Sequence, residues 1–82
     1  MARTKYLKPK PKYLAATLRA YKNSNGMTSN DVGYALDCTP ENARAQMNKP
    51  AISWNMRRLM RYCEVLHVPI EEALNAAAQE LK

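Results

Sequence analysis

MTSNDVGYALDCTPENARAQMN, residues 27–48, is the stretch that decides the fold, because it contains two helix-start signals in close succession. Thr28 is a favoured N-cap residue, and Asp31 follows close behind it, which approximates a capping box although the usual partner is Glu or Gln. Thr39 is a second N-cap, and Pro40 suits the first position of the helix that follows. The stretch therefore predicts two short helices, the second of which ends at about Asn48, before a Lys-Pro pair.

The apolar residues of these two helices are few and are placed on one face of each. The first helix is expected to bury Val32, Ala35 and Leu36, and the second to bury Ala43 and Met47. Only a short turn separates the two helices, and two helices joined this tightly form a helix-turn-helix arrangement.

Three further helices are predicted around this pair. The first covers about residues 11–23, with Pro11 at its first position and an apolar stripe of Leu14, Leu18 and Tyr21. The next begins after Ser53 as N-cap and buries one face, formed by Met56, Leu59, Met60, Cys63 and Leu66. The last, residues 69–81, has Pro69 at its first position and a stripe of Ile70, Ala73, Leu74, Ala77 and Leu81. No stretch alternates as a strand does, so we expect an all-α fold of five helices over residues 11–82.

The charge is positive and unevenly distributed. The chain has 13 Lys and Arg against seven Asp and Glu, for a net charge of +6. Residues 1–30 hold seven of the basic residues and no acid, whereas residues 69–82 carry a net charge of −2. A basic front half on a small chain is typical of proteins that bind polyanions, most often nucleic acid. Residues 1–10 are interpreted as a flexible basic arm, with Arg3, Lys5, Lys8 and Lys10 as candidate contacts to DNA.

Several classes of protein are disfavoured. At 82 residues the chain has room for one domain, and neither a membrane span nor a signal peptide is evident. A cytoplasmic protein is therefore expected. With one histidine and no nucleophile beside a complete set of partners, we expect no enzyme and no small-molecule substrate. Cys63 and His67 have the only metal-like spacing and lack further ligands, so neither a metal nor another cofactor is predicted.

The segment between Thr28 and Leu74 resembles the lambda-repressor-like, Cro/XRE-type helix-turn-helix family. The resemblance rests on residues 27–48 and on the phrase VLHVPIEEAL at residues 65–74. The chain departs from the family pattern at three positions. Gly33 stands where the family usually has Ala, Asp37 stands where Gly usually supplies a left-handed turn, and Ala43 is smaller than the usual aliphatic residue. The resemblance implies a compact five-helix fold with a DNA-recognition helix over about residues 39–48.

Such a helix exposes its N-terminal residues to base edges in the major groove. The candidate base contacts are Glu41, Asn42, Arg44, Ala45 and Gln46. The candidate phosphate contacts are Thr28, Ser29, Asn30, Thr39, Asn48, Lys49, Ser53 and Asn55. Other roles are open for some of them, since Glu41 also suits a helix N-terminus and Thr28 and Ser53 also suit caps. Arg57, Arg58 and Arg61 either approach phosphates or only solubilise their helix.

The resemblance implies a sequence-specific regulator that binds double-stranded DNA in a bacterial cell or nucleoid, of the kind found as small phage or prophage repressors. Repressors of this type usually act as homodimers on pseudo-palindromic operators. The last helix supplies a candidate dimer interface, Ile70, Leu74, Ala77 and Leu81, unless it closes the core of its own subunit. Two alternatives remain open: an antitoxin or autorepressor that also binds a partner protein, and a helix-turn-helix module for protein–protein interaction.

Overall fold

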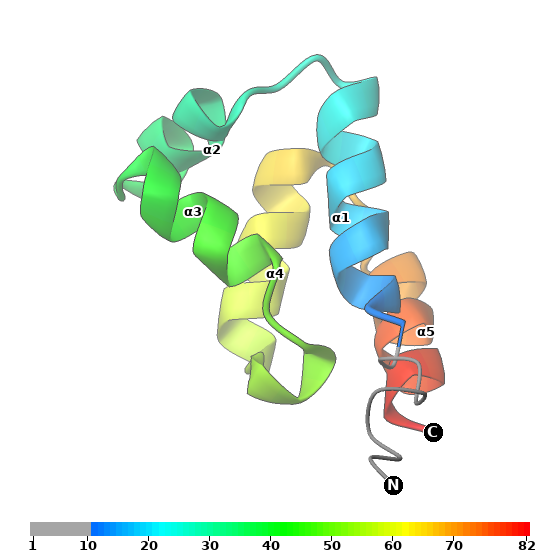
Figure 1. Cartoon of the computed structure of the whole chain (residues 1–82). Coiled ribbons are helices and arrows are strands. Elements are labelled where there is room, and N and C mark those ends of the chain that lie inside the picture. The colour runs from blue at the N-terminus through cyan, green and yellow to red at the C-terminus, as the bar shows by residue number, and fades with distance from the viewer. Residues whose placement is uncertain (1–10) are drawn as a thin grey trace, which may run out of the picture.

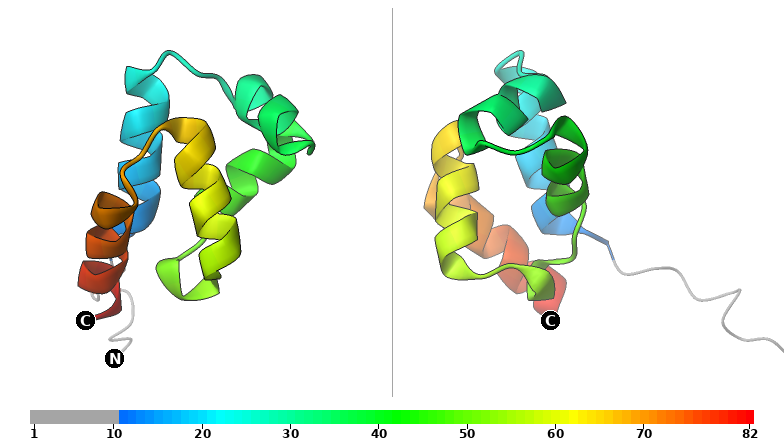
Figure 2. Two further views of the ribbon diagram at one scale, coloured as in Figure 1. Left: turned by 180° about the vertical axis from the view of Figure 1, so that it is seen from behind. Right: turned by 90° about the vertical axis from the view of Figure 1, so that its left-hand side faces the viewer.

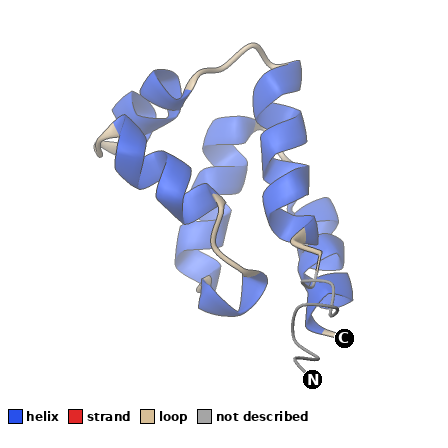
Figure 3. Cartoon of the chain, viewed as in Figure 1, coloured by secondary structure: helices blue, strands red, loops and turns tan. Residues whose placement is uncertain are grey.

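The computed structural model describes residues 11–82, and all regular structure in that part of the chain is helical (Figures 1 and 3). The predicted arm at residues 1–10 lies outside the described residues. The elements in chain order are α1 (Tyr13–Ser24), α2 (Ser29–Leu36), α3 (Pro40–Met47), a short 3-10 helix η2 (Ala51–Ser53), α4 (Met56–Leu66) and α5 (Ile70–Leu81). The expectation of an all-α fold is confirmed for these residues.

The two helix starts in the segment that decides the fold are confirmed. Thr28 and Asp31 form a full capping box, in which the Thr28 hydroxyl accepts from the Asp31 amide at 3.2 Å and the Asp31 carboxylate accepts from the Thr28 amide at 2.9 Å. The Thr39 hydroxyl accepts from the amide of Asn42 at 3.1 Å, and Pro40 is the first residue of α3. Side-chain caps within four residues of sequence therefore fix where both helices begin.

Three other helix starts differ from the prediction. α1 begins at Tyr13 rather than at Pro11, and its N-cap position, Lys12, makes no side-chain cap. Ser53 does not cap α4, because Ser53 closes the 3-10 helix and Asn55 takes the N-cap position. The side chain of Asn55 accepts from the amide of Arg58 at 2.8 Å. Pro69 is the residue before α5 rather than its first residue.

The turn between α2 and α3 depends on two unusual backbone positions. Asp37 ends α2 in the left-handed region, with φ 57° and ψ 46°, which Asp tolerates better than most residues. At Gly33, an added Cβ would lie 2.7 Å from the carbonyl oxygen of Cys38. The amide of Cys38 donates back to the carbonyl of Gly33 at 2.8 Å. Glycine therefore lets the turn fold closely against α2.

The core lies between the five α-helices of residues 11–82, with Leu14, Leu18, Val32 and Leu66 fully buried at its centre. The expected burial of Ala43 and Met47 on α3 is confirmed. Ala35 was expected in the core and is exposed, because α2 turns Gly33 inward beside Val32 instead.

The buried face of α4 is also rotated from the prediction. Met56 and Met60, expected in the core, are exposed, and Tyr62 is buried instead. The ring of Tyr62 packs edge-on against Trp54, with centroids 4.9 Å apart. Within residues 11–82, Met56 is 52% exposed and Met60 is 56% exposed, so this side of α4 faces outward.

Contacts between distant segments hold the helices together (Figure 2). α5 packs along α1, where the Tyr21 hydroxyl donates to the Glu72 carboxylate. Near the other end of α5 the buried carboxylate of Glu80 accepts from two backbone amides, that of Leu14 at 3.1 Å and that of Ala51 at 2.7 Å. Glu80 therefore serves as the missing cap of α1 and joins α5 to the connection between α3 and α4.

Candidate nucleic-acid interface

α3 presents a polar surface opposite the two side chains that it buries. Glu41, Asn42, Arg44 and Ala45, all predicted base contacts, are exposed. Gln46, the fifth predicted contact, is half-buried, and its side-chain oxygen accepts from the guanidinium of Arg58 at 3.3 Å. The amide nitrogen of Gln46 is buried without a hydrogen-bond partner. Four of the five residues are thus free to meet a ligand, while the fifth contacts α4.

A cationic cavity lies on one flank of α3, between α3, α1 and the start of α2. Its volume is about 290 Å³, and no acidic residue lines it. Basic side chains from two helices meet there, and the complete lining is Arg19, Lys22, Asn23, Ser29, Arg44, Met47 and Asn48. We call this the α1 flank. It brings together the predicted base contact Arg44 and the predicted phosphate contacts Ser29 and Asn48.

Two basic side chains, one in α1 and one at its N-cap position, contact the C-terminal end of α3. The guanidinium of Arg19 donates to the side-chain oxygen of Asn48 at 2.6 Å, and the ammonium of Lys12 donates to the Asn48 carbonyl at 3.1 Å. A cation near the C-terminus of a helix complements the negative end of its dipole. Arg19, Lys22 and Lys12 were not among the predicted site residues. Their only signal in the sequence is the absence of acids before residue 31, and it does not say which basic residues face α3.

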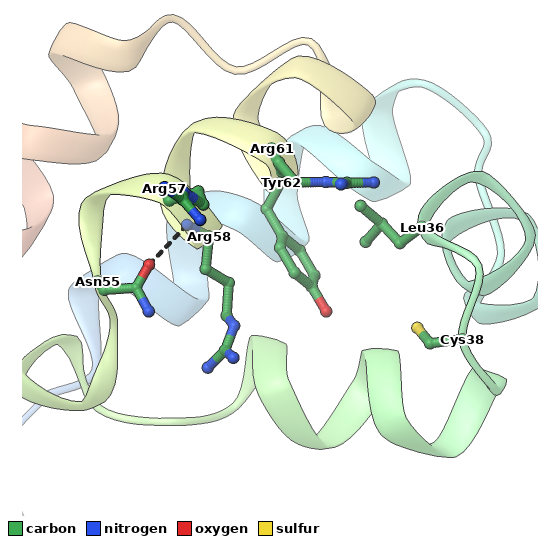
Figure 4. A pocket seen from close by; sticks show the side chains of 7 residues that line it. All are labelled: Leu36, Cys38, Asn55, Arg57, Arg58, Arg61 and Tyr62. Atoms are coloured by element: carbon green, nitrogen blue, oxygen red, sulfur yellow. Dashed lines mark hydrogen bonds between the residues drawn. The ribbon is translucent and has the colours of Figure 1, made fainter.

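A second cationic cavity lies between the end of α2 and the side of α4 that faces α3 (Figure 4). Its volume is about 420 Å³, and again no acidic residue lines it. The lining residues are Leu36, Cys38, Asn55, Arg57, Arg58, Arg61 and Tyr62. Figure 4 shows Arg58 and Tyr62 reaching from α4 toward α3. We call this the α4 flank, and it includes the predicted phosphate contact Asn55.

The hydroxyl of Tyr62 is an available donor in the α4 flank. Burial raises the pKa of Tyr62 above its usual value, and the neighbouring Cys38 raises it further, while Arg58 lowers it. The hydroxyl therefore stays protonated at neutral pH. With three guanidinium groups beside it, the cavity offers donors and positive charge to an anion.

The remaining predicted phosphate contacts are scattered. The hydroxyls of Thr28 and Thr39 already accept from backbone amides as caps, although both residues are exposed. Asn30 is exposed in the first turn of α2, and Lys49 and Ser53 are exposed along the connection from α3 to α4. None of these five residues lines either flank cavity.

The predicted dimer residues on α5 are divided between surface and core. Leu74 and Leu81 are exposed, whereas Ile70 and Ala77 pack partly buried against the core. α5 therefore contributes to the core of its own chain and leaves only two large apolar side chains outside.

Comparison with known proteins gives no relative: no family model, no curated protein and no solved structure matches this chain. None of the helices within residues 11–82 has the length and apolar character needed to cross a bilayer. The same residues contain no group of three or more His, Cys, Asp or Glu side chains arranged to hold a metal ion.

Proposed function

We propose that this chain is a sequence-specific transcription regulator of the lambda-repressor-like helix-turn-helix kind, which binds double-stranded DNA through α3. The observation that carries the proposal is the position of α3 beside two cationic cavities without acidic residues, one toward α1 and one toward α4. A major groove is about 12 Å wide and admits one α-helix between two phosphate backbones. An exposed polar helix with positive charge on both sides matches that environment.

The short connection between α2 and α3 supports the same proposal. Three residues, 37–39, join the two helices, a length typical of helix-turn-helix units, in which the second helix enters the major groove. α2 begins beside the α1 flank, and amides in the first turn of a helix are suited to a phosphate oxygen.

Within this proposal the residues divide into two roles. On α3, Asn42 suits adenine, Arg44 suits guanine and Glu41 suits cytosine, according to the donors and acceptors that each base presents. Arg19, Lys22 and Ser29 on the α1 flank, and Asn55, Arg58 and Arg61 on the α4 flank, contact the two phosphate backbones. Phosphate contacts position the protein, and the α3 contacts select the sequence.

The biological form of the proposal is a small repressor of the Cro type that binds a pseudo-palindromic operator as a dimer. A single α3 contacts only a few base pairs, whereas two copies related by a two-fold axis double the contacts and fix the spacing of the half-sites. Occupancy of the operator would then be regulated by protein concentration.

Selection of bound duplexes from a random pool tests the proposal. We expect one motif to be enriched, with an affinity at least about 10³-fold above that for random duplex. Arg44→Ala should weaken binding to that motif by about 1–3 kcal/mol and relax the preference at one base pair. A pool that yields no enriched motif, or equal affinity for all duplexes, contradicts the proposal.

A further inference from the structure

Five of the seven exposed large apolar side chains within residues 11–82 belong to η2, α4 and α5. They are between 41% and 77% exposed, and they are Ile52, Met56, Met60, Leu74 and Leu81. The view from behind in Figure 2 shows α4 and α5 in front, with α3 behind α4. Of these elements α4 lies behind α3 in Figure 1, and none of the three carries a proposed base contact.

Two of these residues lie on one face of α4. Met56 and Met60 are four residues apart, an interval that places side chains on the same face of a helix, whereas Ile52 belongs to η2. Methionine is flexible and polarizable, and it is frequent on surfaces that bind other proteins. Neighbouring apolar side chains left in water in this way mark an interaction surface.

The charged residues beside these methionines can pair with the same residues of a second copy of the chain. Arg57, Met60, Arg61 and Glu64 line a shallow cavity of about 520 Å³ along α4, and all four are exposed. Arg57 and Arg61 also line the α4 flank, so this face adjoins the proposed phosphate contacts. Arg57 and Glu64 are separated by two helical turns, about 10 Å along the axis, with Met60 between them. In an antiparallel pair of α4 helices, Arg57 of each copy lies opposite Glu64 of the other, and the Met60 side chains meet at the centre.

We propose that the face of α4 formed by Met56, Arg57, Met60 and Glu64 is a self-association surface on which a second copy of this chain docks. A two-fold axis requires a surface that complements itself, and the Arg57–Met60–Glu64 arrangement does so in both charge and apolar character. The inference deepens the proposed function by naming the partner that a DNA-binding dimer requires. It also places the contact on α4, since α5 uses Ile70 and Ala77 in its own core.

Sedimentation equilibrium of the full chain without DNA tests whether this surface forms a dimer. Charge-reversal variants then distinguish the loss of a specific ion pair from general destabilisation. We expect a dimer at micromolar concentration. Arg57→Glu or Glu64→Arg alone places like charges opposite each other and should raise the dissociation constant at least about tenfold. The double variant with both changes exchanges the two charges and should restore dimerisation.

A matched control adds an acid elsewhere: Ala35→Glu, on an exposed position of α2, should leave association unchanged. Circular dichroism of each variant verifies that the fold is retained. A wild-type chain that stays monomeric, single variants that dimerise normally, or a folded double variant that stays monomeric would each overturn the inference. DNA selection by a monomer would overturn the surface and the dimeric form of the repressor but leave sequence-specific DNA binding intact. A dimer without DNA affinity would overturn the proposed function and leave the surface intact.

Discussion

At the scale of single residues, Glu80 is the side chain with the widest structural influence. Its buried carboxylate accepts from the amides of Leu14 and Ala51, which belong to the starts of two different helices. α1 has no side-chain cap of its own, so the carboxylate supplies the acceptor that the first turn lacks. A carboxylate near a helix N-terminus also complements the helix dipole.

Replacing Glu80 should therefore destabilise the whole chain. Glu80→Ala leaves two amides without their acceptor, and we expect the free energy of unfolding to fall by about 2–4 kcal/mol. Urea denaturation followed by circular dichroism measures this change. Glu71→Ala, on an exposed position of the same helix, is the control and should cost much less. A similar loss for both variants would show that the two hydrogen bonds of Glu80 contribute little.

Helix propensity alone predicts that Gly33→Ala stabilises the chain, whereas the structure predicts that it destabilises the chain. Alanine is favoured over glycine in a helix by about 1 kcal/mol, but here its Cβ would lie 2.7 Å from the Cys38 carbonyl oxygen. We expect Gly33→Ala to lower the free energy of unfolding by about 1–3 kcal/mol, because the turn must shift. Thermal denaturation tests the sign, and a stabilised variant would mean that the turn has room for a methyl group.

At the scale of elements, helix starts were predictable where the signal was local. The starts of α2 and α3 follow from Thr28 and Thr39, whose caps involve residues only three positions away. Ser53 and Asn55 are both good caps, so the sequence alone could not choose between them. The choice depends on the 3-10 helix, whose first amide is held by Glu80 from a distant part of the chain.

The buried face of α4 shows the same limit. Its apolar stripe is wider than the surface that the rest of the chain covers, so periodicity places Met56 and Met60 in the core although they are exposed. The candidate site was also predictable only in part. The exposed residues of α3 could be predicted from the burial of Ala43 and Met47. The position of Arg19 beside Asn48 could not, because it depends on how α1 folds back against α3.

The start of α4 gives a matched pair of variants. Asn55→Ala removes the acceptor of the Arg58 amide and should reduce the free energy of unfolding by about 0.5–2 kcal/mol. Ser53→Ala, two residues earlier, removes no side-chain cap and should change stability by less than about 0.5 kcal/mol. Urea denaturation measures the loss of unfolding free energy in each variant. A larger loss for Ser53→Ala than for Asn55→Ala would mean that Ser53 caps α4.

At the scale of the whole molecule, the proposed DNA-binding surface spans four helices. α3 supplies the proposed base contacts, while α1, α2 and α4 contribute most of the lining of the two cationic flanks. Affinity from phosphate contacts depends on salt because bound counterions are released, and each lost contact reduces the slope of log affinity against log salt by about 0.9. The flanks and α3 should therefore respond differently to mutation.

Lys22→Ala and Arg61→Ala test this difference, one on each flank. Neither side chain has a hydrogen-bond partner among the interactions that hold residues 11–82 together. Each variant should weaken binding to specific and random duplex alike and reduce the salt slope by about one unit. Fluorescence anisotropy across a salt series measures both quantities. A slope unchanged in one variant would remove its flank from the interface.

The most direct test of the central claim, that α3 enters the major groove between two cationic flanks, is an NMR titration of the isotope-labelled chain with its selected duplex. Amide shifts should concentrate on α3, on residues 19–22 of α1, on Ser29 at the start of α2, and on residues 55–61 at the start of and within α4. The amides of α5 should move little. Shifts concentrated on α5, with α3 unperturbed at saturation, would contradict the claim.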